Sequence, residues 1–302
     1  MKQYITVVPM FVRWFTLALM SIIVVGCADL SVVRDFSKQS ASLTSAPEAI
    51  DYWGGWSDRS KQYDAITAKL PLRGGSVAKG PTGPKAVPSK EEIEAVKSLQ
   101  SVLSAYMTKL GALADDNLVD VSKQVDGLVD NLNKLPINLP EEKSQEINAA
   151  YGAIIKLVRQ PLDTYRHYKI RAIIQENDGN IQLLTESLSL VMASVGKFSE
   201  QEKNSVMNWY EIITLRYPAE QSFSSAYQWG KNRDSIVQVY QGKSAALESY
   251  RKALQTIGES HHMMAKDLDS FNSDSFKRLS SSLNDARDQI ISARDKYRKA
   301  FE

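Results

Sequence analysis

The sequence has very few of the residues from which cross-links and metal sites are built. Only one cysteine and three histidines occur among its 302 residues. A single cysteine excludes an internal disulfide framework and any metal site built from cysteines. Net charge is also nearly absent: there are 37 lysines and arginines and 35 acidic residues, and two of the cations, Lys2 and Arg13, lie in the first 26 residues. The rest of the chain is formally neutral, so no electrostatic argument favours nucleic acid as a partner.

Motifs that carry common chemistry are missing as well. The chain contains no nucleophile elbow, no P-loop, no dinucleotide-binding glycine pattern and no metalloprotease helix motif. His261 lies in an apolar helical stripe, which predicts a partly buried histidine hydrogen-bonded to the neighbouring helix; a pH-sensitive contact or metal ligand is the alternative. The adjacent His262 would point about 100° away, so the two would not chelate one metal well. We therefore expect no enzyme, no metal, no cofactor and no small-molecule substrate.

The first 26 residues have the pattern of a targeting signal. Lys2 and Arg13 supply positive charge, and Trp14 to Val25 form an apolar run. This run of about twelve residues suits the apolar part of a signal peptide and is too short to span a bilayer, which needs roughly 20. We therefore expect residues 1–26 to be a cleaved signal peptide.

The signal ends in a short motif around the only cysteine. The residues Val24-Val25-Gly26-Cys27 resemble the lipobox of bacterial lipoproteins, with an aliphatic residue three positions before the cysteine and a small one directly before it. The resemblance implies that Cys27 carries a covalent diacylglycerol and an N-acyl chain such as palmitate, and that the mature chain begins there. Ala28, rather than aspartate, follows the cysteine, and in that family this order favours the outer membrane, facing the periplasm. The resemblance covers residues 1–29 and names no family for the remaining chain.

The mature chain is expected to have three parts. Residues 27–70 carry weak helical stripes and form a lipidated N-terminal helical segment. Residues 71–89 contain four of the ten prolines and four glycines, which predicts a linker or exposed loop. Residues 90–302 form the main domain, and its first helix starts at a capping box made by Ser89 and Glu92.

The main domain has the spacing of long packed helices. Apolar residues recur every three or four positions, and no stretch alternates convincingly with period two. We therefore predict an all-α fold, an elongated antiparallel bundle of coiled-coil-like helices. Three local features are expected: a helix over 118–135, a kink at Pro161 and a helix end at Asn177-Asp178-Gly179.

Large aromatic residues gather in two places. One group lies close to the predicted anchor, and the other lies on either side of Pro218. Tryptophan and tyrosine are favoured at protein interfaces and at the lipid headgroup layer, so these residues are candidates for partner contact. The alternative is that the rings fill the ends of the bundle. The candidates are Tyr52, Trp53, Trp56, Trp209, Tyr210, Tyr217, Tyr227 and Trp229.

Together these patterns predict a lipid-anchored envelope protein without enzymatic activity. Its partners would be the membrane, through the lipid, and an unidentified envelope protein, in an interaction or structural role. One concrete form of that role is immunity-type neutralisation of a toxin that reaches the periplasm. The alternative is a membrane-active protein whose amphipathic helices insert as those of helical pore-formers do.

Overall fold

A computed structural model describes most of the chain after the predicted signal. Cys27 and the signal peptide lie outside the described residues, so the predicted lipid site has no structural description. The described residues are 30–69, 79–84, 87–115, 121–130, 132–161, 166–216, 223–267 and 273–301.

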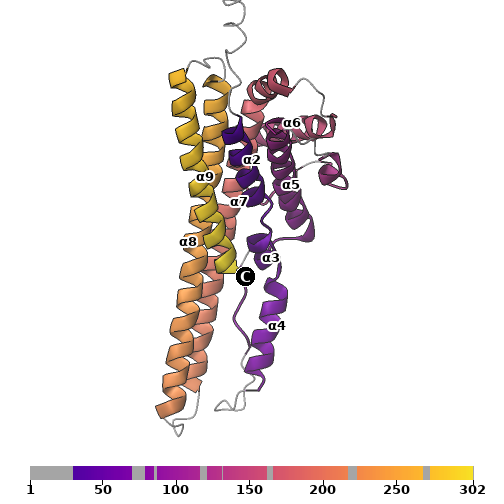
Figure 1. Cartoon of the computed structure of the whole chain (residues 1–302). Coiled ribbons are helices and arrows are strands. Elements are labelled where there is room, and N and C mark those ends of the chain that lie inside the picture. Colours follow the sequence, from indigo (N-terminus) through magenta and orange to yellow (C-terminus); the bar gives the residue numbers. More distant parts are fainter. Residues whose placement is uncertain are drawn as a thin grey trace, which may run out of the picture.

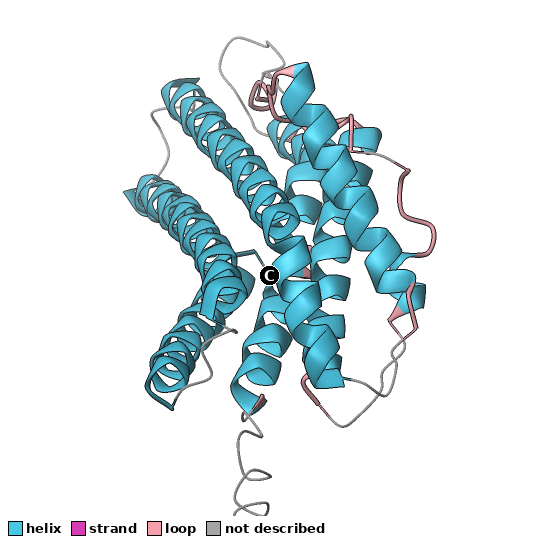
Figure 2. Ribbon diagram, turned by 90° about the horizontal axis from the view of Figure 1, so that it is seen from above, coloured by secondary structure: helices cyan, strands magenta, loops and turns pink. Residues whose placement is uncertain are grey.

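The described residues form helices and loops and contain no β-strand, which confirms the predicted all-α class (Figure 1). Figure 2 shows the helices running side by side when the molecule is seen from above. No helix in this part of the chain has the length and apolar character needed to cross a membrane. In chain order the elements are α2 (Ser31–Thr44), α3 (Glu48–Gly54), α4 (Trp56–Thr67), α5 (Lys90–Leu113), the 3₁₀ turn η1 (Ser122–Val125), α6 (Glu141–Arg159), α7 (Arg166–Arg216), α8 (Phe223–Asp267) and α9 (Ser273–Phe301).

The antiparallel pair α7–α8 is the longest feature of the molecule. At 51 residues, α7 spans about 76 Å and runs through the predicted helix end at Asn177-Asp178-Gly179, so that prediction is wrong. Burial of Ile174 and Ile181 on either side of that triplet keeps α7 packed on its neighbours. A glycine inside a helix costs only about 1 kcal/mol, which such packing outweighs.

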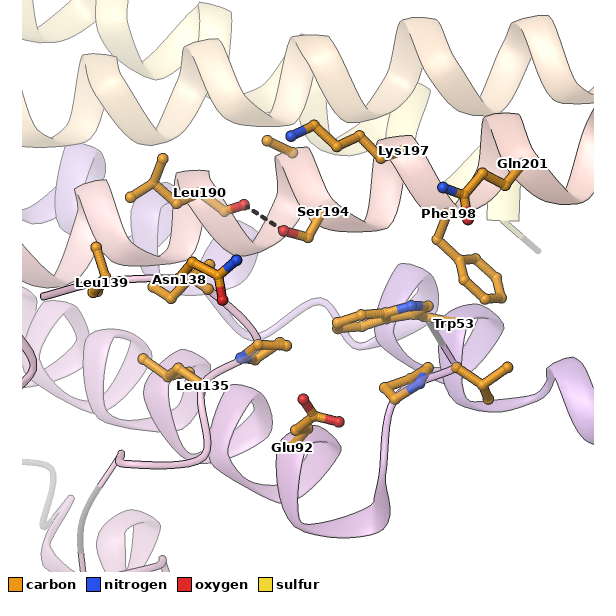
Figure 3. A pocket seen from close by; sticks show the side chains of 15 residues that line it. Trp53, Glu92, Leu135, Asn138, Leu139, Leu190, Ser194, Lys197, Phe198 and Gln201 are labelled. Atoms are coloured by element: carbon orange, nitrogen blue, oxygen red, sulfur yellow. Dashed lines mark hydrogen bonds between the residues drawn. The ribbon is translucent and has the colours of Figure 1, made fainter. Parts of the chain in front are cut away.

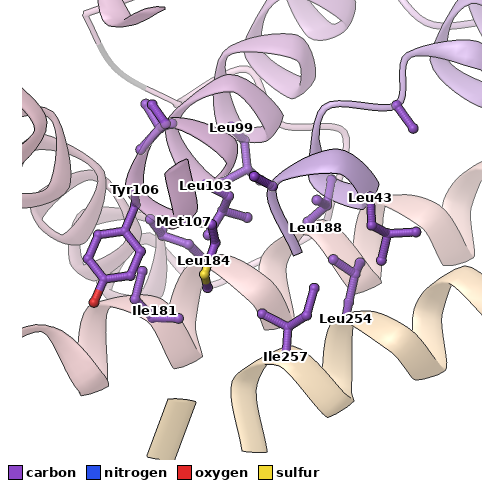
Figure 4. Packing of buried hydrophobic residues seen from close by; sticks show 14 of the residues in the cluster. Leu43, Leu99, Leu103, Tyr106, Met107, Ile181, Leu184, Leu188, Leu254 and Ile257 are labelled. Carbon is purple, nitrogen blue, oxygen red and sulfur yellow. The ribbon is translucent and has the colours of Figure 1, made fainter. Parts of the chain in front are cut away.

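The N-terminal helices share one hydrophobic core with the long helices. Phe36 and Leu43 of α2 are fully buried and belong to the same cluster as Leu103, Leu188 and Leu254. Figure 4 shows side chains from α2, α5, α7 and α8 meeting at this place. The predicted N-terminal segment is therefore part of the bundle over its described residues and does not form a separate unit.

Two predicted helical features are wrong. Residues 118–135 do not form a helix, because their described part contains only η1 and a loop that α6 holds. In that loop, the amide of Leu132 donates to Asn148 Oδ1 at 2.5 Å, and the hydroxyl of Tyr151 donates to the carbonyl of Val129 at 2.9 Å. Pro161 does not kink α6, which ends at Arg159, two residues before the proline.

The end of α6 is capped by a buried lysine from α5. Lys109 is 3% exposed, and its Nζ donates to the carbonyls of Leu157 at 2.7 Å, Val158 at 3.2 Å and Gln160. The last carbonyls of a helix lack partners within the helix and carry partial negative charge, so a cation satisfies both needs. This contact fixes the end of α6 against α5.

The proline-rich segment packs on the bundle where the structure describes it. The amide of Gly80 donates to Asp64 Oδ1 at 2.8 Å, which ties this segment to α4. Gly83 lies so close to Trp56 that a β-carbon there would meet the indole nitrogen at 2.5 Å. The capping box at Ser89 and Glu92 is confirmed by reciprocal bonds of 2.6 and 3.2 Å. These contacts do not fit a free linker.

Candidate functional site

The aromatic residues nearest the predicted anchor lie inside the molecule. Tyr52, Trp53 and Trp56 are only 9%, 4% and 5% exposed. Their rings surround Phe198 of α7 in edge-to-face contacts, each with ring centres 6.4 Å apart. These rings pack against α7 and leave little free surface for the predicted partner contact, although Trp53 also lines the groove described below.

The second aromatic group is divided. Trp209 is 4% exposed, and its indole nitrogen donates to Thr67 Oγ1 at 3.0 Å, so it fixes α4 to α7 and is also not a surface contact. Tyr210 is partly buried, with its ring centre 5.0 Å from that of Trp209. Tyr227 is 58% exposed on α8 and remains a surface candidate. The remaining two predicted residues, Tyr217 and the side chain of Trp229, lie outside the described part of the chain.

A buried carboxylate connects α3 and α4 to the long helices, and no sequence pattern predicted it. The side chain of Glu202 is 1% exposed and accepts two bonds from Arg59, at 3.0 and 2.7 Å. The hydroxyls of Tyr52 and Tyr240 donate to the same carboxylate at 2.8 and 2.9 Å. A buried charge is costly unless it is paired and hydrogen-bonded, and Glu202 meets both conditions within this chain. We interpret this cluster as a structural joint, meaning the set of bonds through which Glu202 of α7 holds Tyr52 of α3, Arg59 of α4 and Tyr240 of α8.

A lysine lies against the same joint. Nζ of Lys243 is 3.7 Å from the ring centre of Tyr52, and the guanidinium of Arg59 is 4.1 Å from that ring. Burial lowers the pKa of Lys243 to about 8, although the nearby Glu202 acts in the opposite direction. The cation–π contact of Lys243 thus holds α3 on α8, while the Arg59–Glu202 ion pair holds α4 on α7.

The two adjacent histidines share one carboxylate. The hydroxyl of Tyr106 lies 2.6 Å from His261 Nε2, and His261 Nδ1 lies 3.0 Å from Asp178 Oδ1. His262 Nδ1 reaches the other oxygen of Asp178 at 2.5 Å. The predicted hydrogen bonding to a neighbouring helix is present, but His261 is fully buried and not partly buried as predicted. Among the described residues, no group of three or more His, Cys, Asp or Glu side chains is arranged so that it could hold a metal ion.

The protonation states in this chain of groups follow from burial. Burial lowers the pKa of His261, and its bond to Asp178 only partly offsets this. Burial also opposes the charged form of Asp178, but hydrogen bonds from His261 and His262 outweigh it and lower the pKa of Asp178 to about 2. A neutral His261 satisfies every group, since it accepts from Tyr106 and donates to Asp178.

Stability is expected to fall in acid because of His261. Its pKa in the folded protein is below the unfolded value of about 6.5, so its contribution is complete above that pH and is lost as the pH falls below it. Asp178 adds a further loss as the pH falls from about 4 towards about 2. The free energy of unfolding, measured with urea from pH 7.5 to 4.5, should fall by up to about 1.4 kcal/mol per pH unit. His261→Gln, which keeps one donor and one acceptor, should flatten the slope while His262→Gln retains it; equal slopes in both variants contradict the assignment.

A groove lies on the side of the bundle. It has a volume of about 600 Å³ and lies between α3, the start of α5, the loop 135–139 and α7. Figure 3 shows Leu135, Leu139 and Leu190 at one end and Trp53 with Phe198 at the other. Clefts of ~300–1,000 Å³ are the usual size for ligand binding. Sequence reasoning missed this groove because four segments far apart in the chain build it.

The groove combines an apolar surface with a polar edge. Leu190 is 39% exposed and Val87 46%, and the loop 135–139 adds partly exposed side chains. Lys197 and Gln201 are exposed along the part of the groove that α7 forms after Leu190. Such a surface can bind a molecule or segment that has both apolar and polar groups.

Comparisons with known proteins add no relative. The chain matches no family model, and no curated protein and no solved structure is similar to it at a significant level. The function is therefore inferred from the sequence motif and from the geometry above.

Proposed function

We propose that the protein is a lipid-anchored, non-enzymatic interaction protein of the bacterial envelope, facing the periplasm from the outer membrane. The observation that carries this proposal is the sequence Val24-Val25-Gly26-Cys27, which places the only cysteine directly before a packed helical bundle. Two or three acyl chains on one residue bind a membrane almost permanently, whereas one chain binds only marginally.

The shape of the bundle supports a tethered role. The described chain begins at the start of α2, and the C-terminal end of α7 and the start of α8 lie at the opposite end of the molecule (Figure 1). An anchor three residues before Leu30 would therefore let a body of about 76 Å extend from the membrane. The groove lies part way along this body, where a soluble or envelope protein can reach it.

A tethered bundle with an open groove fits contact with a protein partner. Neutralisation of a periplasmic toxin is one form that this contact can take. In a membrane-active protein, by contrast, the helices would have to leave a core in which Leu99, Leu103 and Leu184 are fully buried. Exposing such side chains costs about 1.5–3 kcal/mol each, so we propose the interaction role.

Two assays on the full chain separate the roles. We expect affinity capture after crosslinking in intact cells to recover a specific envelope protein. Vesicles that carry the full chain should keep an entrapped dye. Strong leakage at low protein concentration would instead support the membrane-active role, and capture that returns no specific protein would contradict the interaction role.

A further inference from the structure

Two charged side chains line the groove, and they differ in the bonds that they make among the described residues. Glu92 and Lys197 are its two charged lining residues. The carboxylate of Glu92 accepts the amide of Ser89 at 2.6 Å in the capping box, so it serves the start of α5. Lys197 is exposed and makes no ion pair or hydrogen bond within the part of the chain that the structure describes. Of the two, Lys197 is the charge that an incoming carboxylate can pair with, while the carboxylate of Glu92 keeps its negative charge at the start of α5.

The apolar lining of the groove favours an occupant with aliphatic groups. Leu190 projects from α7 and Val87 from the segment before α5, and both are unusually exposed for aliphatic residues in this chain. Leu135 and Leu139 of the loop lie at the end of the groove where Leu190 lies (Figure 3). Covering such surface gains about 25 cal/mol per Å² removed from water, so the occupant should bring aliphatic side chains here.

The polar edge distinguishes between kinds of occupant. Asn138 and Gln201 line the groove with exposed amide groups, which can both donate and accept hydrogen bonds. An extended peptide backbone has matching donors and acceptors at every residue. A simple alkyl chain has none and would leave both amides without a partner when it displaces water. The mixed lining thus favours a polypeptide over a fatty acid.

We propose that the groove binds an extended segment of a protein partner in which an acidic residue is flanked by aliphatic ones. This inference rests on the proposed function, since it names the surface and the chemistry of the partner. Lys197 pairs with the carboxylate, Leu190 and Val87 contact the aliphatic side chains, and the two amides bind the backbone.

Site-specific crosslinking in cells of the native host tests this inference on the full chain. The photoreactive residue p-benzoylphenylalanine replaces Ala193 in one variant and Ser194 in a second; both are partly exposed in the groove, and neither is among the residues proposed to bind the partner. Val239, which is 54% exposed on α8 outside the groove, is the matched control position. We expect both groove positions, and not position 239, to give an adduct with one protein. The crosslinked peptide, mapped by mass spectrometry, should contain Asp or Glu next to aliphatic residues.

Charge variants then test the role of Lys197. Lys197→Glu should lower the adduct yield at least about fivefold, because an exposed ion pair is replaced by repulsion, whereas Lys197→Arg should stay within about twofold. An adduct with lipid alone, equal adducts from position 239, or a yield unaffected by Lys197→Glu would overturn the groove assignment. A protein adduct from position 239 without one from the groove would overturn it as well but keep the interaction function. No protein adduct from any position would overturn both.

Discussion

Replacing Glu202 by alanine is expected to lower the free energy of unfolding by about 3–5 kcal/mol. The variant leaves the Arg59 guanidinium without its carboxylate and the hydroxyls of Tyr52 and Tyr240 without their acceptor. Removing the carboxylate from a partly buried cation and the charged acceptor from two buried hydroxyls is among the costliest changes that a single substitution can make. Thermal and urea unfolding of the full chain, followed by circular dichroism, measure the loss.

The control for this prediction lies two residues away on the same helix. Glu200 pairs with Lys203 at 2.6 Å, but its side chain is 55% exposed. Exposed pairs contribute little, so Glu200→Ala should change stability by less than about 1 kcal/mol. If Glu202→Ala were no more destabilising than Glu200→Ala, the joint between α3, α4 and the long helices would not have the importance assigned to it.

Replacing Cys27 by serine is expected to abolish incorporation of labelled palmitate and to leave the signal peptide uncleaved. Lipidation needs the thiol, and the chain has no second cysteine to accept the label. Metabolic labelling and the apparent size of the precursor on a gel measure the result. In a Cys27→Ser background, Ser45→Cys supplies a thiol outside the motif and should not restore the label. Palmitate labelling that persists in Cys27→Ser would contradict the assignment of the lipid to Cys27.

The sequence predicted the helical class because apolar spacing reports helix packing directly. Local break signals were less reliable. Asn177-Asp178-Gly179 lies inside α7, since packing against α8 outweighs a cost of about 1 kcal/mol. Residues 118–135 have helical spacing but belong in part to a loop, because Asn148 and Tyr151 of α6 satisfy its backbone groups. Tertiary contacts of this kind are invisible in a local pattern.

The aromatic residues show why composition alone did not locate a surface. Tyr52, Trp53, Trp56 and Trp209 are the kinds of residue that interfaces favour, yet each is buried against α4 or α7. Cores and interfaces both bury large rings, so the same residues fit either role. The groove was not predicted because its residues have ordinary identities and become a site only through the path of the chain.

The charged clusters were partly predictable. The apolar stripe around His261 indicated its burial, but its partners Tyr106 and Asp178 are 155 and 83 residues away in sequence. Glu202 lies 143 residues from Arg59, and no periodicity marks the pair. A buried charge is recognised only when the group that compensates it is known.

The most direct test of the proposed anchor is the mass of the N-terminal peptide of the protein purified from its native cells. We predict a peptide that begins at Cys27 and carries a diacylglycerol on sulfur and an acyl chain on its new amino group. A mature peptide that begins elsewhere, or one with an unmodified Cys27 thiol, would contradict the anchor and with it the envelope location.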